Sequence, residues 1–232
     1  ISVCRQMGIQ ILPPDINRGM YGFSVDKGAI RYALSAIKSI GRPVIEGIVR
    51  EREEHGEYTS LKTFVERNIN QINKRVVENL IKAGALDCLE GNRKQKMFVY
   101  PQIIDSINQD KKHSMAGQMS LFDIVSEEDK KEFEIRMPQI AEYTNDVILA
   151  FEKDVLGIYL SGHPLEQYRS MMEKMISAKT SDFQPDDETG IPEVYDNQKV
   201  IVGGMITDKT IKYTKNNKVM AFLTLEDLVG TV

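Results

Sequence analysis

Residues 32–50 read YALSAIKSIGRPVIEGIVR, and this stretch decides the fold of the first half of the chain. Apolar residues recur at helical spacing on both sides of a break at residues 39–43. Within the break, Gly41 suits a left-handed turn, and Pro43 suits the first turn of a following helix. The stretch therefore predicts two helices joined by a tight turn.

A weaker copy of this pattern follows at residues 64–82, shifted by 32 positions. Asn73 stands at the place of Gly41, and asparagine is a non-glycine residue that tolerates a left-handed conformation well. Lys74 likewise stands at the place of Arg42. Each copy is thus predicted to be a helix, a turn and a helix, with a basic residue beside the turn.

Such a turn directs backbone N–H groups and the positive end of a helix dipole toward solvent, which favours phosphate without selecting a base. We therefore predict a tandem helix-hairpin-helix domain at residues 29–112 that binds the backbone of duplex DNA. The predicted contacts are Lys38, Ser39, Ile40, Gly41, Arg42, Asn73, Lys74 and Arg75. An ordinary bundle of helical hairpins is the alternative, because a glycine between two helices is common.

The distribution of charge supports DNA binding for one segment only. The chain of 232 residues has 30 basic and 34 acidic side chains, a net charge of −4. Residues 1–113 carry 18 basic and 13 acidic side chains, residues 114–199 carry 8 and 18, and residues 200–232 carry 4 and 3. A polyanionic partner is therefore expected for the first segment and not for the second. Three basic residues also open a predicted helix, where they fit either a nearby phosphate or a solvated face: Arg93, Lys94 and Lys96.

The composition excludes several classes of protein. A hydrophobic fraction of 41% is enough for a packed core, so the chain is not disordered throughout. No apolar run is long enough to cross a membrane, and no signal-peptide pattern opens the chain. Cys4 and Cys88 have neither disulfide nor zinc spacing, which indicates reduced thiols in the cytoplasm. The histidines are scattered, so no catalytic or metal site is predicted, and His163 is assigned to a turn.

A polar segment at residues 113–135 is predicted to be a linker that contains a short binding motif. The motif places two neighbouring apolar side chains behind a glutamine. Such a pair fills a pocket on a partner, while the amide sets its orientation. The residues of the motif are Gln118, Met119, Ser120, Leu121 and Phe122. The alternative is that Leu121 and Phe122 anchor the loop to the surface of this same protein.

The remainder of the chain changes from helical to strand patterns. Residues 136–197 are predicted to be a helical connector, and residues 198–232 to contain strands at 200–206, 212–213 and 219–225. These strands open a small β-barrel that stops before it closes, so we expect a fragment of a longer protein. The fold class is therefore mainly α, followed by a truncated all-β start, in a multi-domain fragment. Three side chains are either candidate contacts to a single strand or part of a solvated hairpin: Lys212, Tyr213 and Lys215.

In this order the parts resemble those of the C family of bacterial replicative DNA polymerases, the DNA polymerase III alpha subunits. The resemblance covers essentially the whole chain and corresponds to the C-terminal half of the family. It rests on motifs that follow one another as they do in the family, at residues 8–17, 34–41, 73–85, 118–122, 156–165 and 214–227.

The resemblance implies a role for each part of the chain. Residues 1–28 would end a fingers segment, residues 29–112 would grip duplex DNA, and the motif at 118–122 would bind the sliding clamp, the beta subunit. Residues 198–232 would open an OB fold that faces single-stranded template. The clamp contact would raise the effective concentration of the enzyme at the primer end and so support processive replication.

The family polymerises DNA with two Mg²⁺ ions held by carboxylates in a palm domain. No part of this chain resembles the palm. The resemblance therefore implies a non-catalytic fragment that has no cofactor of its own and works with other replicase subunits. Two alternatives remain open. One is a free-standing DNA-repair module with hairpins and an OB fold. The other is a protein adaptor without a DNA role, whose working surface is the acidic segment 114–199.

Overall fold

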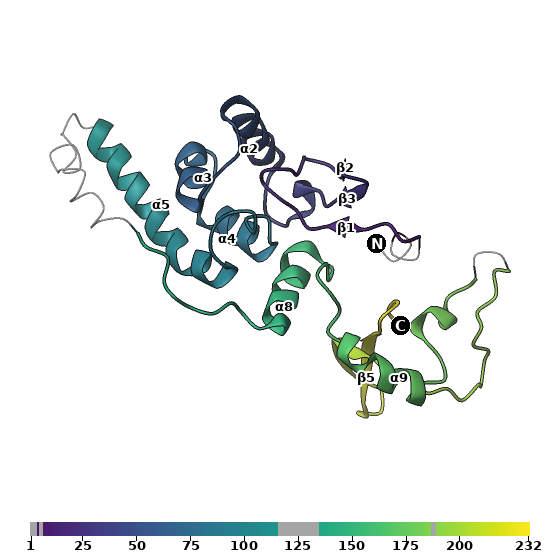
Figure 1. The fold of residues 1–232 in the computed structure, drawn as a ribbon. Helices are drawn as coiled ribbons and strands as arrows, with labels where there is room; N and C mark the ends of the chain where they lie inside the picture. Colours follow the sequence, from purple (N-terminus) through teal and green to yellow (C-terminus); the bar gives the residue numbers. More distant parts are fainter. Residues whose placement is uncertain (1–3, 5–6, 116–134, 187–188) are drawn as a thin grey trace. The chain divides into compact units, whose positions relative to one another are not determined.

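The computed structural model describes residues 4, 7–115, 135–186 and 189–232. Contacts divide the chain into a first unit that ends at Ser161 and a second unit, Gly162–Val232 (Figure 1). The predicted fold class is confirmed, since helices dominate the first unit and the main strands follow in the second. The division into five parts stays a prediction. The boundary between the units lies inside the segment 136–197 that was predicted as one connector.

The first unit begins with a small sheet. Strand β1 (Ile11–Leu12) pairs in parallel with β3 (Ala29–Arg31), and β3 pairs antiparallel with β2 (Ser24–Asp26). Lys27 and Gly28 have φ angles of 52° and 84°, which are the angles that a two-residue hairpin turn requires. β2 and β3 therefore form a tight hairpin, which makes up the middle and one edge of the sheet.

The helices of the first unit follow the sheet. They are the 3₁₀ helix η1 (Leu34–Ala36) and the helices α2 (Arg42–His55), α3 (Leu61–Asn68), α4 (Lys74–Lys82), α5 (Arg93–Met115) and α8 (Asn145–Leu156). Large apolar side chains from these elements and from the segments between them form one buried cluster that includes Ile37, Ile45, Phe64, Leu80 and Leu86. The cluster holds the two turns of the predicted hairpins over a common core.

The first predicted helix, at residues 32–40, is not an α-helix. Residues 32–40 form a single 3₁₀ turn instead of an α-helix. The cause is the sheet, because the Tyr32 N–H still donates to the Leu12 carbonyl at 3.0 Å. Only a few residues then separate the sheet from the turn before α2. The second copy does form two helices, α3 and α4, as predicted.

The segment predicted as a helical connector is helical only in part. Residues 135–144 are not helical, and α8 starts at Asn145 and ends at Leu156, followed by Gly157, whose φ of 78° is left-handed. Polar side chains before and in α5 bind this segment: the Asn92 amide donates to the Ile140 carbonyl at 2.9 Å, and the Gln95 amide donates to the Pro138 carbonyl at 2.7 Å. Backbone groups that lack helical partners are thus satisfied by side chains.

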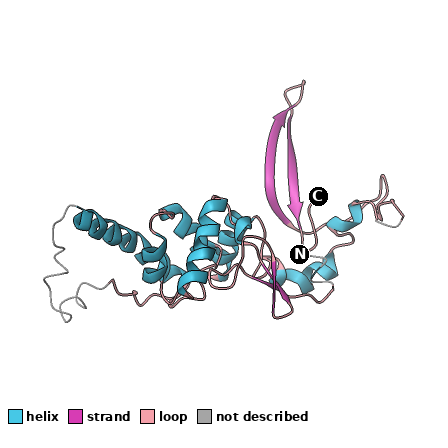
Figure 2. Ribbon diagram, turned by 90° about the horizontal axis from the view of Figure 1, so that it is seen from above, coloured by secondary structure: helices cyan, strands magenta, loops and turns pink. Residues whose placement is uncertain are grey.

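The second unit contains short helices and one long strand pair. Its elements are η2 (Glu166–Tyr168), α9 (Arg169–Met175), η3 (Thr180–Phe183), β4 (Met205–Tyr213) and β5 (Val219–Glu226). The strands pair antiparallel as a ribbon (Figure 2). The predicted strand at 200–206 is wrong, because residues 200–204 lie outside strands and β4 runs through the break that was predicted before residue 212.

One local prediction for the second unit is consistent with the structure. His163 serves a turn, since its Nδ1 accepts from the Leu165 N–H at 3.2 Å. The Asp227 carboxylate links β5 to η3, because it accepts from the backbone N–H and the hydroxyl of Thr180 at 2.8 and 2.7 Å. None of the helices that the structure describes is long and apolar enough to span a membrane.

Candidate nucleic-acid interface

The first turn, residues 38–42, has a different backbone from the one predicted. Ser39 is the left-handed residue, with φ of 64°. Gly41 is extended, with φ of −73° and ψ of 153°, and it serves as the N-cap of α2. The prediction that Gly41 takes the left-handed conformation is therefore wrong. The tight turn between the two elements is present, and its left-handed residue comes two positions before the glycine.

Two long-range hydrogen bonds fix this turn. The Lys38 N–H donates to the Val155 carbonyl of α8 at 2.8 Å. The Lys38 carbonyl accepts from the Asn79 side-chain amide of α4, also at 2.8 Å. Asn79 is only 8% exposed, so its amide has few alternatives to this bond. The backbone of the turn is thus held from both sides, while the side chains of Lys38 and Ser39 face solvent.

The start of α2 is open toward solvent. Within the part of the chain that the structure describes, no side chain caps this end of the helix, and no acidic residue lies in its first turn. A Cβ added at Gly41 would meet only the Pro43 Cδ, at an ordinary 3.7 Å. Since the backbone at Gly41 suits any residue, the fold does not need a glycine there. The missing side chain leaves space at the positive end of the helix dipole.

Arg42 stands directly beside this opening. Its side chain is 68% exposed, and its Nε donates to Glu46 Oε1 at 2.7 Å. The hydrogen bond to Glu46 is the main cause that raises the pKa of Arg42. The guanidinium also lies over the Tyr21 ring, 5.0 Å from its centroid. Ile40, the remaining residue of the predicted contact set in this turn, is buried and anchors the turn to the core.

The second turn leads into α4 and is capped. Asn73 has φ of −132° and is extended, so its predicted left-handed conformation is also wrong. Its side chain instead accepts from the Val76 N–H at 3.0 Å, which is the normal role of an N-cap asparagine. Lys74 forms an exposed ion pair with Asp105 of α5 at 2.8 Å. Arg75 is exposed next to it.

Gly47 brings the second turn close to α2. A Cβ at this buried position would lie 1.8 Å from Oε1 of Gln71, a residue of the second turn. Gln71 is held in place by a bond from its Nε2 to Asn68 Oδ1 at 2.8 Å. The sequence pattern did not identify Gly47 or Asn79. The signals that could have identified them are a glycine and an amide side chain on the apolar faces of amphipathic helices.

The start of α5 does not fit the phosphate interpretation of its basic residues. The Glu142 carboxylate accepts from the backbone N–H groups of Arg93 and Lys94 at 2.8 and 3.1 Å. The chain thus supplies its own anion at this helix end. Arg93 is buried and pairs with Asp87 at 2.7 Å. Lys96 is fully buried, its ammonium donates to the Gly91 carbonyl, and burial lowers its pKa.

The other predicted sites divide into two cases. The motif Gln118, Met119, Ser120, Leu121 and Phe122 lies outside the described residues. In the hairpin, Lys212 and Tyr213 are consecutive residues of β4 and therefore point to opposite faces. The two side chains therefore do not share one face of the ribbon, and their contact with a single strand stays a prediction. Lys212 instead lies over Phe222 of β5, 5.1 Å from the ring centroid. Lys215 is in the connecting turn.

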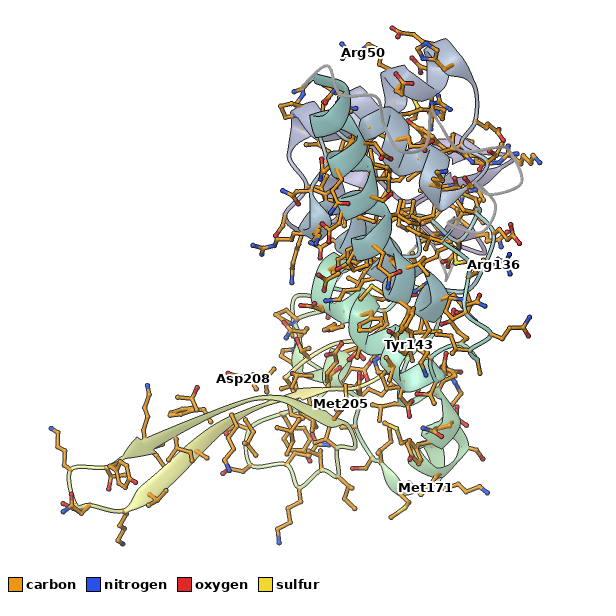
Figure 3. All side chains as sticks on the ribbon, turned by 90° about the vertical axis from the view of Figure 1, so that its left-hand side faces the viewer. Arg50, Arg136, Tyr143, Met171, Met205 and Asp208 are labelled. Atoms are coloured by element: carbon orange, nitrogen blue, oxygen red, sulfur yellow. The ribbon has the colours of Figure 1, made fainter. Side chains whose placement is uncertain are left out.

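Figure 3 shows the side chains of the hairpin projecting from both faces of the ribbon, near the labelled Met205 and Asp208. Tyr213 is 74% exposed and shares its face with Ile211 and Val219. Phe222 is 53% exposed. The aromatic ring that lies beside a lysine on this ribbon is therefore Phe222.

Among the described residues, one group could bring three metal-ligand atoms together: Glu51, Glu54 and His55 on α2. Glu51 already accepts from the Arg67 guanidinium at 3.0 Å, and Glu54 and His55 are exposed. This set is an ordinary exposed helix end with an internal ion pair. We assign no metal to it.

Comparisons with known proteins agree with this geometry. A family model described as a helix-hairpin-helix motif matches residues 8–96. The chain is 33% identical to DNA polymerase III subunit alpha of Borreliella burgdorferi, over 100% of this chain and 20% of that protein. The chain matches one section of the DNA polymerase III alpha subunit. The resemblance predicted from the sequence is thereby confirmed.

Other alpha subunits give similar values. The subunit of Vibrio cholerae is 33% identical over 99% of this chain, and that of Escherichia coli is 30% identical over 99%. The chain spans about one fifth of the curated alpha subunits that it matches. The helix-hairpin-helix match begins at residue 8, so it includes the small sheet as well as both turns. These matches support DNA binding and a role in DNA replication.

Proposed function

We propose that the first unit binds the backbone of duplex DNA within a replicative DNA polymerase. The observation that carries this proposal is the open start of α2 at Gly41, flanked by exposed Lys38 and Arg42, inside the helix-hairpin-helix match. A phosphate at this point would gain the helix dipole and two nearby cations. The start of α4, with Lys74 and Arg75, would bind a second phosphate. These contacts do not depend on base sequence.

The ion pairs that these basic side chains form within the protein are weak enough to be replaced by contacts with phosphate. Both the Arg42–Glu46 pair and the Lys74–Asp105 pair are largely exposed, with side chains between 49% and 68% accessible. Exposed pairs of this kind contribute about 0–1 kcal/mol each. A phosphate that also releases counterions from DNA can therefore replace Glu46 or Asp105 as the partner.

The test is duplex affinity of the full chain over a series of salt concentrations. The combined change Gly41→Val and Lys74→Glu should weaken binding about ten-fold or more and reduce the salt slope by roughly 1 for each phosphate that is no longer bound. Valine adopts the extended backbone of residue 41 without strain, so the fold should be retained. Lys62→Glu is the matched control, because Lys62 is 60% exposed on α3 and its reversal changes the charge equally. Absence of salt-dependent binding in the unaltered chain, or equal affinities of the double variant and the control, would overturn the proposal.

A gain of affinity provides the opposite test. Glu46→Gln removes the partner of Arg42 and one negative charge near the first turn. Duplex affinity should rise about two-fold, because an i,i+4 pair of this kind contributes about 0.3–0.5 kcal/mol. Glu53→Gln, an exposed residue on the same helix, is the control. Unchanged or reduced affinity of the Glu46 variant would show that Arg42 does not contact phosphate.

We further propose that residues 118–122 dock on the sliding clamp, and that this section carries no catalytic site of the polymerase. The support is the order of apolar residues behind Gln118 and the alpha-subunit match over the whole chain. Replacing Leu121 and Phe122 by Ala should abolish binding to the purified clamp and leave duplex binding unchanged. Retained clamp binding would remove the motif from the proposal. Nucleotide incorporation by this chain alone on a primed template with Mg²⁺ would contradict a non-catalytic role.

The hairpin of the second unit is proposed to be the start of an OB fold. Its two long antiparallel strands and its exposed apolar residues on both faces favour this assignment, since further strands would cover one of these faces. Contact with a single strand would then use Lys212 with Phe222, and not Lys212 with Tyr213. Phe222→Leu should lower the affinity for single-stranded DNA, and Tyr213→Leu should lower it less. The reverse order would contradict this assignment.

A further inference from the structure

A group of large apolar side chains is exposed in the loop before the β2–β3 hairpin and in its first strand. Met20, Tyr21, Phe23 and Val25 are 41%, 39%, 60% and 81% exposed. We call these four residues the aromatic patch. Single exposed apolar residues are common on proteins, but four within six positions of one another are a sign of a binding surface.

The loop that carries the aromatic patch is held in a defined place. The Leu34 and Ser35 N–H groups donate to the carbonyls of Met20 and Tyr21, both at 3.1 Å. The buried Arg52 guanidinium of α2 donates to the Gly19 carbonyl at 2.8 Å. Phe23 packs edge-to-face on the buried Tyr32, with 4.9 Å between the ring centroids. The exposed rings are therefore presented on fixed backbone, at a low entropic cost for a ligand.

The aromatic patch joins the first turn through Arg42. The guanidinium of this residue lies 5.0 Å from the centroid of the Tyr21 ring, and Arg42 follows Gly41 at the open start of α2. A nucleotide strand whose phosphate lies at this helix end would thus have the Tyr21 ring within reach of the neighbouring sugar or base.

Several cations lie around the aromatic patch, with Asp26 and the Arg42 partner Glu46 as acidic neighbours. Asp26 is bound by the Arg31 guanidinium, and this hydrogen bond is the main cause that lowers the pKa of Asp26. Arg18 and Lys27 act on the same carboxylate, which places two further exposed cations next to the loop. Aromatic rings between cations are the composition of surfaces that stack unpaired bases, whereas a docking surface for an acidic protein needs no flat rings.

We propose that the aromatic patch stacks an unpaired base that continues the strand held by the first turn, so that this unit recognises the junction between duplex and single strand. The inference rests on the proposed duplex binding and adds a specificity to it. In intact duplex the bases are covered by their neighbours, and only an unpaired base can present its face to Tyr21 or Phe23.

The test compares a blunt duplex with the same duplex carrying a short unpaired extension, both with the full chain. We expect the extended DNA to bind about five-fold or more tightly, from the stacking of one base. The variant Tyr21→Leu with Phe23→Leu keeps apolar side chains but removes the flat rings. It should lose this preference and bind blunt duplex within about two-fold of the unaltered chain. Tyr168→Leu with Tyr195→Leu is the matched control, because these tyrosines of the second unit are 46% and 72% exposed.

A fluorescent base makes the contact itself visible. 2-Aminopurine as the first unpaired nucleotide should be quenched by the unaltered chain and by the control, and less by the leucine variant. Equal affinities for blunt and extended DNA, or full preference and quenching in the leucine variant, would overturn the inference while leaving duplex binding intact. Absence of binding to blunt duplex would instead refute the proposed function on which the inference rests.

Discussion

Replacing Ser39 with glycine should stabilise the chain, and replacing Gly41 with alanine should leave its stability nearly unchanged. The reason is the backbone of the first turn, where Ser39 has φ of 64° and Gly41 has φ of −73°. The sequence pattern predicts the opposite behaviour, because it assigns the left-handed conformation to Gly41. The two substitutions therefore distinguish the observed turn from the predicted one.

The expected magnitudes follow from these angles. A left-handed conformation costs a non-glycine residue about 1–2 kcal/mol, whereas glycine costs about 0.5–1 kcal/mol through the greater entropy of the unfolded chain. Ser39→Gly should therefore raise the free energy of unfolding by about 0.5 kcal/mol. At Gly41 the entropy gained by alanine is offset by the loss of the N-cap preference for glycine. The added Cβ meets only the Pro43 Cδ at 3.7 Å, so no clash is expected.

Urea unfolding followed by far-UV circular dichroism measures these differences. The chain has no tryptophan, and most of its helices belong to the first unit, so the helical signal reports on the unit that contains the turn. Ser39→Val is a third variant, because a β-branched side chain in the left-handed region is strongly disfavoured, and it should cost more than about 1 kcal/mol.

A loss of about 1–2 kcal/mol in Gly41→Ala, together with a loss in Ser39→Gly, would refute the observed geometry. Such a result would show that the left-handed residue in solution is Gly41. The free energies of the variants can be compared only if they share the same m value, the slope of the unfolding free energy against urea concentration. A changed m value would indicate a change in the unfolded or native ensemble instead of the turn.

Three further predictions concern an amide, a thiol and a carboxylate. Asn79→Leu should cost about 1–3 kcal/mol in urea unfolding, because the Lys38 carbonyl loses its donor, and it should also weaken duplex binding; normal duplex affinity would show that the bond does not position the turn. Cys88 is an exposed residue, but desolvation of its sulfur and the nearby Asp15 carboxylate raise the pKa of the thiol to about 12. Iodoacetamide should therefore alkylate it about ten-fold or more slowly than an ordinary thiol at neutral pH, and equal rates in the folded and urea-unfolded chain would contradict this. Burial opposes ionisation of Asp227, but hydrogen bonds led by those of Thr180 outweigh it and lower the pKa. Ionised Asp227 should therefore stabilise the second unit fully above about pH 4, and this stabilisation should be lost as the pH falls through the pKa of the folded state. Amide hydrogen exchange of the second unit should show this pH dependence in the unaltered chain and not in Asp227→Asn.

Elements whose cause is local can be derived from neighbouring residues alone. The β2–β3 hairpin follows from Lys27 and Gly28 between two apolar runs, and the cap of α5 follows from Asn92, whose Oδ1 accepts from the Gln95 N–H at 2.8 Å. The helix expected at residues 32–40 failed for a non-local reason. Its first residues remain bonded to β1, and the periodic apolar side chains pack into the core from a single 3₁₀ turn.

The sequence predicted the positions of the two turns in the candidate site but not their backbone conformation. Residue types located the two turns and their basic side chains. The conformation of the first turn depends on Asn79 and Val155, which lie far along the chain and bind the two backbone groups of Lys38. The basic start of α5 depends in the same way on Glu142, 49 residues from Arg93. Contacts at such separation leave no periodic signal in the sequence.

The helix ends of the first unit indicate where an external anion is expected. α3 is capped by Ser60, α4 by Asn73, and α5 receives the Glu142 carboxylate. α8 has Asp146 in its first turn. Among the described α-helices of this unit, only α2 has neither a side-chain cap nor an acidic residue in its first turn. Since none of the residues that the structure describes places a negative group at this helix end, the favourable interaction with the dipole of α2 is open to a ligand. The neighbouring Lys38 and Arg42 favour an anion, and phosphate on a DNA strand is the one that we propose.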